Sequence, residues 1–209
     1  MIKSGRILLA ICGGLAFLPA AGASTVFTFN MDACSGTCGA SPFGTVSLAQ
    51  TGAGGAGTFV TVIETLAANE RFAGTGAGDA LEFNVAGPVT LGNITAGFEV
   101  GPAPDTASAF GIFLKSIECT ACQGGKAGNP VGPLSFKVSS ASGVTVSDFT
   151  ANAGGYYFAT DIVGNNGNTG NVGARGSGQQ PTPEPATLTL TGLGLLGLGA
   201  LGRRRRQPR

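Results

Sequence analysis

The sequence predicts an all-β fold, an antiparallel and jelly-roll-like β-sandwich ectodomain over residues 24–164, between an N-terminal signal peptide and a single C-terminal transmembrane helix. Three observations support this prediction. Apolar and polar residues alternate along short segments, stretches rich in Gly and Pro separate these segments, and no segment before the tail has a long helical apolar stripe. Many short strands without crossover helices are typical of antiparallel sandwiches.

The alternating segments are the strand candidates. A period of two places one face of each strand in a core and the other in water. Nine segments follow this pattern: 26–31, 45–50, 58–66, 81–85, 89–94, 110–119, 134–139, 144–149 and 156–163. After residue 164 the composition changes to Gly, Asn, Ser and Gln, so residues 165–181 are predicted to be a linker.

Composition excludes several classes of function. The chain has 209 residues, of which 37 are Gly, and it contains no His and no Trp. Without His there is no Ser-His-Asp or Cys-His nucleophile and no imidazole metal site. Residues 24–180 carry five basic and ten acidic residues, so no nucleic-acid partner is expected. We expect no enzymatic activity and no cofactor.

The N-terminus has the features of a secretory signal peptide over residues 1–23. Lys3 and Arg6 supply positive charge, and residues 7–18 are apolar. Small side chains then form the predicted cleavage site, made by Ala21, Ala23 and Ser24. Cleavage there implies the Sec machinery and signal peptidase as partners, and an exported mature protein.

Two alternatives to this cleavage remain open. The first is a retained membrane anchor, although twelve apolar residues are too few to span a bilayer. The second is a lipoprotein cut before Cys12, which the preceding Ile11 disfavours because a small residue is wanted there. Cleavage after Ala23 is therefore the preferred interpretation.

The C-terminal tail, residues 182–209, has three parts in a fixed order. Pro183, Glu184 and Pro185 precede seventeen uncharged residues, 186–202, which form the predicted transmembrane helix. As a helix they would rise about 26 Å, slightly less than a hydrocarbon core of about 30 Å. A basic cluster follows, made by Arg203, Arg204, Arg205 and Arg206. These arginines should stay cytoplasmic and leave the preceding domain outside.

This tail resembles the PEP-CTERM sorting signal, which is handled in Gram-negative bacteria by exosortase, a membrane protease. Two departures are the Thr182 before the triplet and the three residues after the arginines. The resemblance implies an exosortase partner and transient anchoring in the inner membrane. It also implies release to the cell surface or to an extracellular matrix such as a biofilm, where extracellular polysaccharide is a further candidate partner.

Four cysteines follow the signal peptide in two short-range pairs, Cys34 with Cys38 and Cys119 with Cys122. In an oxidising exterior an even number of cysteines predicts disulfides, and we favour the two local pairs because each brackets a turn. Cross-pairing between the two loops, a Cys₄ zinc site and a thioredoxin-like role for the second pair are the alternatives. The exported compartment argues against zinc.

Acidic residues provide the remaining candidates. Paired carboxylates can hydrolyse glycosides without His. Five glutamates are available, but solvated charges on strand faces are the preferred interpretation: Glu64, Glu70, Glu82, Glu99 and Glu118. Asp161 could bind Ca²⁺ together with Asn165, Asn166 and Asn168, although turn formation by these side chains is favoured.

Two functions follow from these observations. The preferred one is a non-enzymatic protein of the cell surface or extracellular matrix. The alternative is a carbohydrate-binding or polysaccharide-acting module displayed by the same route. The adjacent Tyr156 and Tyr157 should place one ring on an outer face, where it could stack on a sugar.

Overall fold

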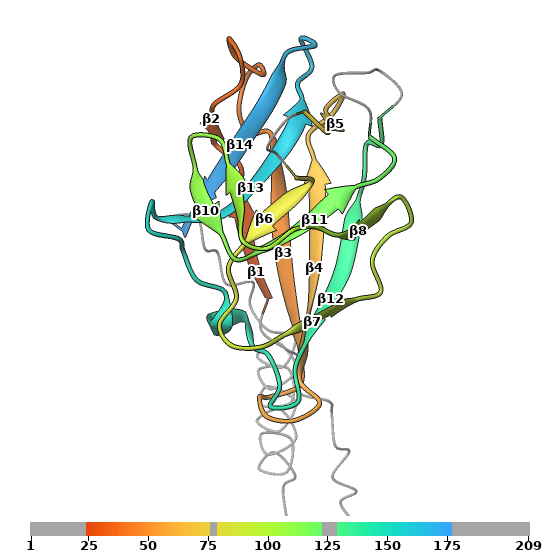
Figure 1. The fold of residues 1–209 in the computed structure, drawn as a ribbon, viewed down its shortest axis with the longest axis vertical. Helices are drawn as coiled ribbons and strands as arrows, with labels where there is room; N and C mark the ends of the chain where they lie inside the picture. Colours follow the sequence, from red (N-terminus) through yellow and green to blue (C-terminus); the bar gives the residue numbers. More distant parts are fainter. Residues whose placement is uncertain (1–23, 76–78, 123–128, 177–209) are drawn as a thin grey trace, which may run out of the picture.

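The computed structural model describes residues 24–75, 79–122 and 129–176. Two antiparallel sheets account for most of this chain (Figure 1). The five-stranded sheet has, in spatial order, β1 (Ser24–Thr28), β3 (Gly44–Thr51), β4 (Phe59–Leu66), β12 (Leu134–Ser139) and β7 (Thr90–Gly92). The all-β, antiparallel prediction is therefore confirmed for the described residues.

The seven-stranded sheet is built mainly from the later part of the chain. Its spatial order is β2 (Met31–Asp32), β14 (Thr169–Arg175), β13 (Tyr156–Val163), β6 (Leu81–Phe83), β11 (Lys115–Cys119) and β8 (Phe98–Val100), and β5 (Arg71–Phe72) also pairs with β13. A separate hairpin joins β9 (Asp105–Ala107) to β10 (Gly111–Phe113). All recorded strand pairings are antiparallel.

The two sheets pack face to face through aromatic side chains. The rings of Phe27 and Phe158 lie 4.9 Å apart, and those of Phe83 and Phe136 lie 5.5 Å apart, each pair joining one sheet to the other. Along β4 the buried positions alternate with half-buried or exposed ones, as a period of two requires. The alternation in the sequence thus produces the core between the sheets.

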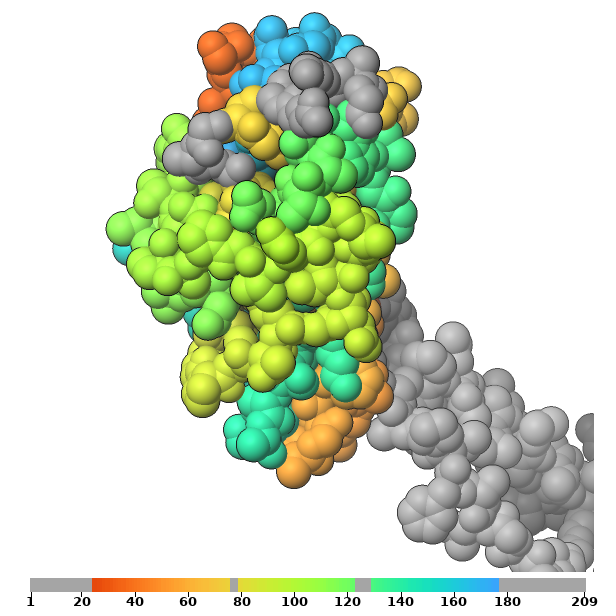
Figure 2. Space-filling view, turned by 45° about the vertical axis from the view of Figure 1, so that its right-hand side comes forward, coloured from red at the N-terminus to blue at the C-terminus, as the bar shows by residue number. Residues whose placement is uncertain are grey.

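A second, smaller core lies on the outer face of the seven-stranded sheet. There the β9–β10 hairpin packs through Ala107, Phe110 and Phe113 against Tyr156 and Ala159 of β13. All three residues of β6 are buried, as are all residues of β13 except one. The central strands of this sheet are therefore covered on both faces. In the space-filling view, the middle of the chain, coloured yellow to green, forms a continuous surface layer (Figure 2).

The predicted linker 165–181 is wrong for residues 169–175, because these form β14, between β13 and β2. Glycine allows neighbouring segments to approach this strand closely. A Cβ on Gly170 would lie 2.6 Å from the Cα of Cys34, and one on Gly173 would lie 2.8 Å from the ring of Phe110. Polar, glycine-rich composition here indicates close packing and not a free linker.

Two other strand predictions need correction. Residues 144–149 contain a 3₁₀ turn, Val146–Asp148, because the Asp148 carboxylate accepts hydrogen bonds from the backbone and hydroxyl of Thr145, both at 2.8 Å. The segment 110–119 is two strands, β10 and β11, which are interrupted at Leu114. The N–H of Leu114 donates to the side-chain oxygen of Asn84 at 2.8 Å instead of to a neighbouring strand.

Within the three described ranges, no helix has the length and apolar character needed to cross a membrane. The predicted signal peptide 1–23 and the predicted transmembrane helix 186–202 lie outside the described residues. Both remain predictions from the sequence.

Candidate functional site

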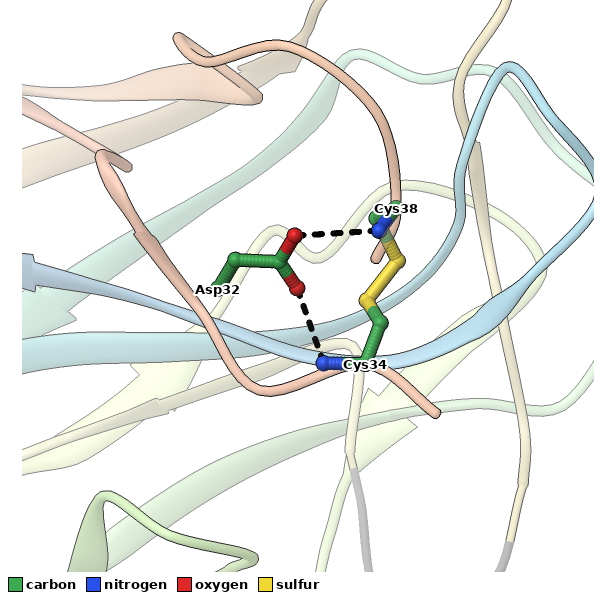
Figure 3. Close-up of side chains that lie close together, drawn as sticks. All are labelled: Asp32, Cys34 and Cys38. Atoms are coloured by element: carbon green, nitrogen blue, oxygen red, sulfur yellow. Dashed lines mark hydrogen bonds between the residues drawn. A yellow bond between two sulfur atoms is a disulfide. The ribbon is translucent and has the colours of Figure 1, made fainter. Parts of the chain in front are cut away.

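The first predicted disulfide joins Cys34 and Cys38, whose Cα atoms lie 5.6 Å apart. Asp32, at the end of β2, holds the loop between them (Figure 3). One of its carboxylate oxygens accepts the N–H of Cys34 at 2.8 Å, and the other accepts the N–H of Cys38 at 3.0 Å. A single carboxylate therefore fixes both ends of the disulfide loop.

The second disulfide joins Cys119 and Cys122, with a Cα separation of 5.4 Å. It closes the turn that follows β11, and the N–H groups of Thr120 and Ala121 both donate to the carbonyl of Gly97. The preference for two local pairs is confirmed. Each disulfide fixes a turn at the end of a strand.

Asp32, Cys34 and Cys38 also form a group whose possible ligand atoms lie within 4.8 Å of one another. The sulfur atoms are bonded to each other, however, and a metal needs thiolates. The Cys₄ zinc alternative does not fit either, because the four sulfurs form two separate disulfides.

The glutamates divide into two groups. Glu99 and Glu118 are exposed, as predicted, and face each other as register partners on β8 and β11. Glu64, Glu70 and Glu82 are buried, with at most 2% of each residue exposed. For these three, the prediction of solvated strand-face charges is wrong.

Glu64 lies in the core between the two sheets. It occupies the same face of β4 as Val62 and Leu66 and pairs in register with Val46 and Leu134. Burial raises its pKa well above the usual value of 4.5, and a weaker interaction with Thr160 lowers it. The Thr160 hydroxyl donates to the carbonyl of Ala80 at 2.7 Å, and neither oxygen of Glu64 has a hydrogen-bond partner. Burial therefore favours the neutral form of Glu64 in the folded protein.

Glu70 lies in the turn between β4 and β5. Burial raises its pKa to about 7, the backbone of Ala67 lowers it, and the charge of Asp32 raises it. Glu70 is thus linked electrostatically to the acid that holds the first disulfide loop.

Four carboxylates gather on the outer side of the seven-stranded sheet, and we call them the outer carboxylate cluster: Asp79, Glu82, Asp105 and Asp161. Glu82 lies in register with Ser116 of β11 and Ala159 of β13. Burial raises its pKa to about 9, and the charged groups that raise it further are the three other members of the cluster. Burial also raises the pKa of Asp79, to about 6.

These buried acids are poorly placed for glycoside hydrolysis, which needs two carboxylates on either side of a bound sugar. Glu64 and Glu82 are fully buried and lie on different sheets. Among the five candidate glutamates in the described chain, only Glu99 and Glu118 are direct neighbours on adjacent strands. Both side chains lie on the exposed surface.

Asp161 does not form a site with the three asparagines that the sequence analysis considers as its partners in Ca²⁺ binding. The turn after β13 is closed by Asn166, whose side-chain oxygen accepts the N–H of Asn168 at 3.1 Å. The amides of both asparagines donate to the carbonyl of Thr37. Asn165 lies against Gly39. Turn formation by these asparagines, the favoured interpretation, is confirmed.

Asp161 instead faces a cavity of about 310 Å³ on the outer side of the sheet. Its carboxylate accepts the N–H of Thr75 at 2.8 Å and the hydroxyl of Thr75 at 2.6 Å, both through Oδ2. Burial raises its pKa, and interactions with Thr75 and with the backbone of Ile162 lower it. The other oxygen, Oδ1, has no hydrogen-bond partner.

The two tyrosines are largely covered. Tyr156 lies on the outer face as predicted, but it packs edge-on against Phe110, and the guanidinium of Arg175 lies 4.4 Å from its ring centre. Tyr157 is half-buried against Phe27. A cavity of about 380 Å³ next to Tyr156 is lined by Phe110, Ile112 and Asn152, among others.

Comparison with known protein families gives one match, which lies in the C-terminal tail of the chain. The model of the PEP-CTERM protein-sorting motif matches residues 181–206, which include Pro183, Glu184, Pro185 and the arginines up to Arg206. The chain is therefore an exported protein that is targeted to an exosortase. No curated protein and no solved structure matches the chain.

Proposed function

We propose that this chain is a non-enzymatic protein of the cell surface or extracellular matrix. Its folded part is a disulfide-containing β-sandwich, and residues 186–202 anchor it to the inner membrane until exosortase removes the tail. The observation that carries this proposal is the sorting motif at residues 181–206, which begins five residues after Gly176, the last described residue of the domain.

The chemistry of the domain supports a structural role. Its four cysteines are in disulfides, so none serves as a nucleophile. The acids with the most strongly shifted pKa values, Glu64 and Glu82, have no exposed surface on which a substrate could bind. The sequence contains no His to act as a base near neutral pH.

The alternative is a carbohydrate-binding module displayed by the same route. The cavity beside Tyr156 favours it, because an aromatic wall with a nearby amide is a common setting for a sugar ring. A glycan array with the full-length protein tests this alternative. Binding that is lost in Tyr156→Ala and retained in Tyr157→Ala would support it.

Tail processing is tested by the mass of the C-terminus in cells with and without an exosortase. We expect the wild-type protein to lose Arg209 only when the enzyme is present. Glu184→Ala should accumulate as an uncut, membrane-bound precursor, since the acid lies between the two prolines of the recognised motif. Glu99→Ala is the matched control, because it removes an exposed acid outside the sorting motif. An intact Arg209 in exosortase-containing cells would contradict the proposal.

A further inference from the structure

We propose that the cavity beside Asp161 binds a divalent cation, Ca²⁺ in preference to Mg²⁺, with the Asp161 carboxylate as the anchoring ligand. This inference concerns the folded domain and does not depend on how the tail is processed. It rests on a buried carboxylate oxygen without a partner, on the oxygen-bearing side chains around it, and on the charge of the neighbouring groups.

Asp161 is one of the residues that line this cavity. It lies on β13 directly opposite Asn171 of β14, so both side chains project from the same outer face of the sheet. Asp161 has no exposed surface, and Asn171 is 4% exposed. Thr75 occupies Oδ2 of Asp161 and thereby fixes the orientation of the carboxylate, while Oδ1 remains without a hydrogen-bond partner. A buried carboxylate oxygen of this kind is stabilised by a proton, a cation or an ordered water.

The walls of the cavity carry neutral oxygen atoms. Ser35 comes from the disulfide loop after β2, Ser108 from the turn of the β9–β10 hairpin, and Thr169 from the start of β14. Three separate segments therefore bring hydroxyl-bearing residues to the lining of one space of about 310 Å³. Hydroxyl, amide and carboxylate oxygens are hard ligands, which suit Ca²⁺ and Mg²⁺ better than the softer transition metals.

The surrounding charge favours a cation. Asp161 lines the cavity and interacts electrostatically with Glu82, which also interacts with Asp79 and Asp105. Three of the four described basic groups are engaged elsewhere: Arg71 donates to the carbonyl of Asn129, Lys137 lies over Phe59 and Arg175 lies over Tyr156. The fourth, Lys115, does not line the cavity. An anionic ligand would be repelled from this cluster, whereas a divalent cation would be attracted.

The nature of the site favours Ca²⁺. Mg²⁺ requires near-octahedral ligands at about 2.0–2.1 Å, whereas Ca²⁺ accepts six to eight oxygens at about 2.3–2.6 Å in less regular arrangements. A roomy cavity with one carboxylate, several neutral oxygens and space for water matches the second description. No three carboxylates among the described residues lie close enough together to form a tighter site. The affinity should therefore be in the range of extracellular modules, about 10⁻⁴–10⁻³ M.

The experiment is a calorimetric titration of the full-length protein with CaCl₂ near neutral pH, repeated with MgCl₂. We expect saturable binding of one Ca²⁺ and at least tenfold weaker binding of Mg²⁺. Asp161→Asn keeps the shape of the side chain but removes its charge, and it should weaken Ca²⁺ binding at least tenfold. Glu99→Gln is the matched control, because it removes one exposed acid from the same sheet outside the cavity.

A second variant tests the proposal independently, in case Asp161→Asn does not fold. Thr169→Val removes one hydroxyl at the start of β14, and it should weaken Ca²⁺ binding several-fold while leaving the far-UV spectrum unchanged. Absence of saturable Ca²⁺ binding up to 10 mM, a concentration about tenfold above the expected range, would overturn the proposal. Equal Ca²⁺ affinity in the wild type and in a folded Asp161→Asn protein would also overturn it, since Asp161 would then not be the ligand.

Discussion

The central strands of the seven-stranded sheet, β6 and β13, are buried on both faces, but the two faces are built from different side chains. The inner face presents Phe83, Phe158 and Ile162 to the other sheet, in a large apolar core. The outer face presents Glu82, Ala159 and Asp161 to the β9–β10 hairpin, and its apolar part is a cluster of five buried residues. The same two strands therefore support an apolar core on one side and a cluster of acids on the other. The inner face therefore supplies the larger apolar core, while the outer face carries the acids on which the proposed cation site depends.

The largest expected effect is on the free energy of unfolding, when one phenylalanine on each face of the sheet is replaced with Ala. Phe83→Ala should lower the free energy of unfolding by about 3–5 kcal/mol, because it leaves a cavity in the main core. Phe113→Ala should cost less, since the β9–β10 hairpin pairs only with itself and can separate locally from the sheet. Urea denaturation of both variants measures the two costs. Equal losses would mean that both faces belong to one cooperative unit.

The strands of the main core could be predicted from the sequence because their alternation is local. Residues 58–66 and 134–139 have a clear period of two, and β4 and β12 form there. The same alternation places Glu64 on the face of Val62 and Leu66, so its burial was already indicated by the pattern. Residue type alone predicts the opposite, because an acid is rarely buried without a partner.

The outer face could not be predicted in this way. Alternation correctly directs Glu82 away from Phe83, but only the three-dimensional fold shows that the β9–β10 hairpin covers that side. The position of β14 was also missed, because its glycines resemble a linker in composition. Their role depends on contacts with Cys34 and Phe110, which are distant in sequence. The grouping of Asp161 with Ser35, Ser108 and Thr169 is non-local for the same reason.

An intermediate effect is expected at Glu64, the one acid on β4 that faces the apolar core. Glu64→Leu should raise the free energy of unfolding at pH 7 by about 1–3 kcal/mol, because it removes buried polar atoms that have no partner. The pKa of Glu64 is raised in the folded protein, so the folded state holds a proton that the unfolded state releases above about pH 4.5. Wild-type stability should therefore fall as the pH rises above 4.5.

Denaturation of the wild type and Glu64→Leu between pH 4 and pH 8 measures this dependence. The variant should show a smaller decrease with rising pH than the wild type, and the exposed Glu99→Leu should leave the decrease unchanged. If Glu64→Leu and the wild type lose stability equally over this interval, Glu64 is not held as a neutral acid.

The smallest expected effect comes from the disulfide loop that carries Ser35 to the outer face. Cys34 and Cys38 enclose a short loop, so replacing both with Ser should cost at most about 2 kcal/mol of unfolding free energy. Cys119 and Cys122 enclose an even shorter loop, so replacing both with Ser should cost a similar amount. The two pairs should differ in another respect. Only the first loop contributes to the cavity beside Asp161, so only its loss should weaken Ca²⁺ binding. Asp32 should limit this weakening, because it continues to bind both N–H groups of the loop.

Calorimetric titration of the two double variants separates these outcomes. Equal Ca²⁺ affinity in both would mean that the disulfide loop does not shape the outer face, and that the difference between the two faces lies in β13 and β14 alone.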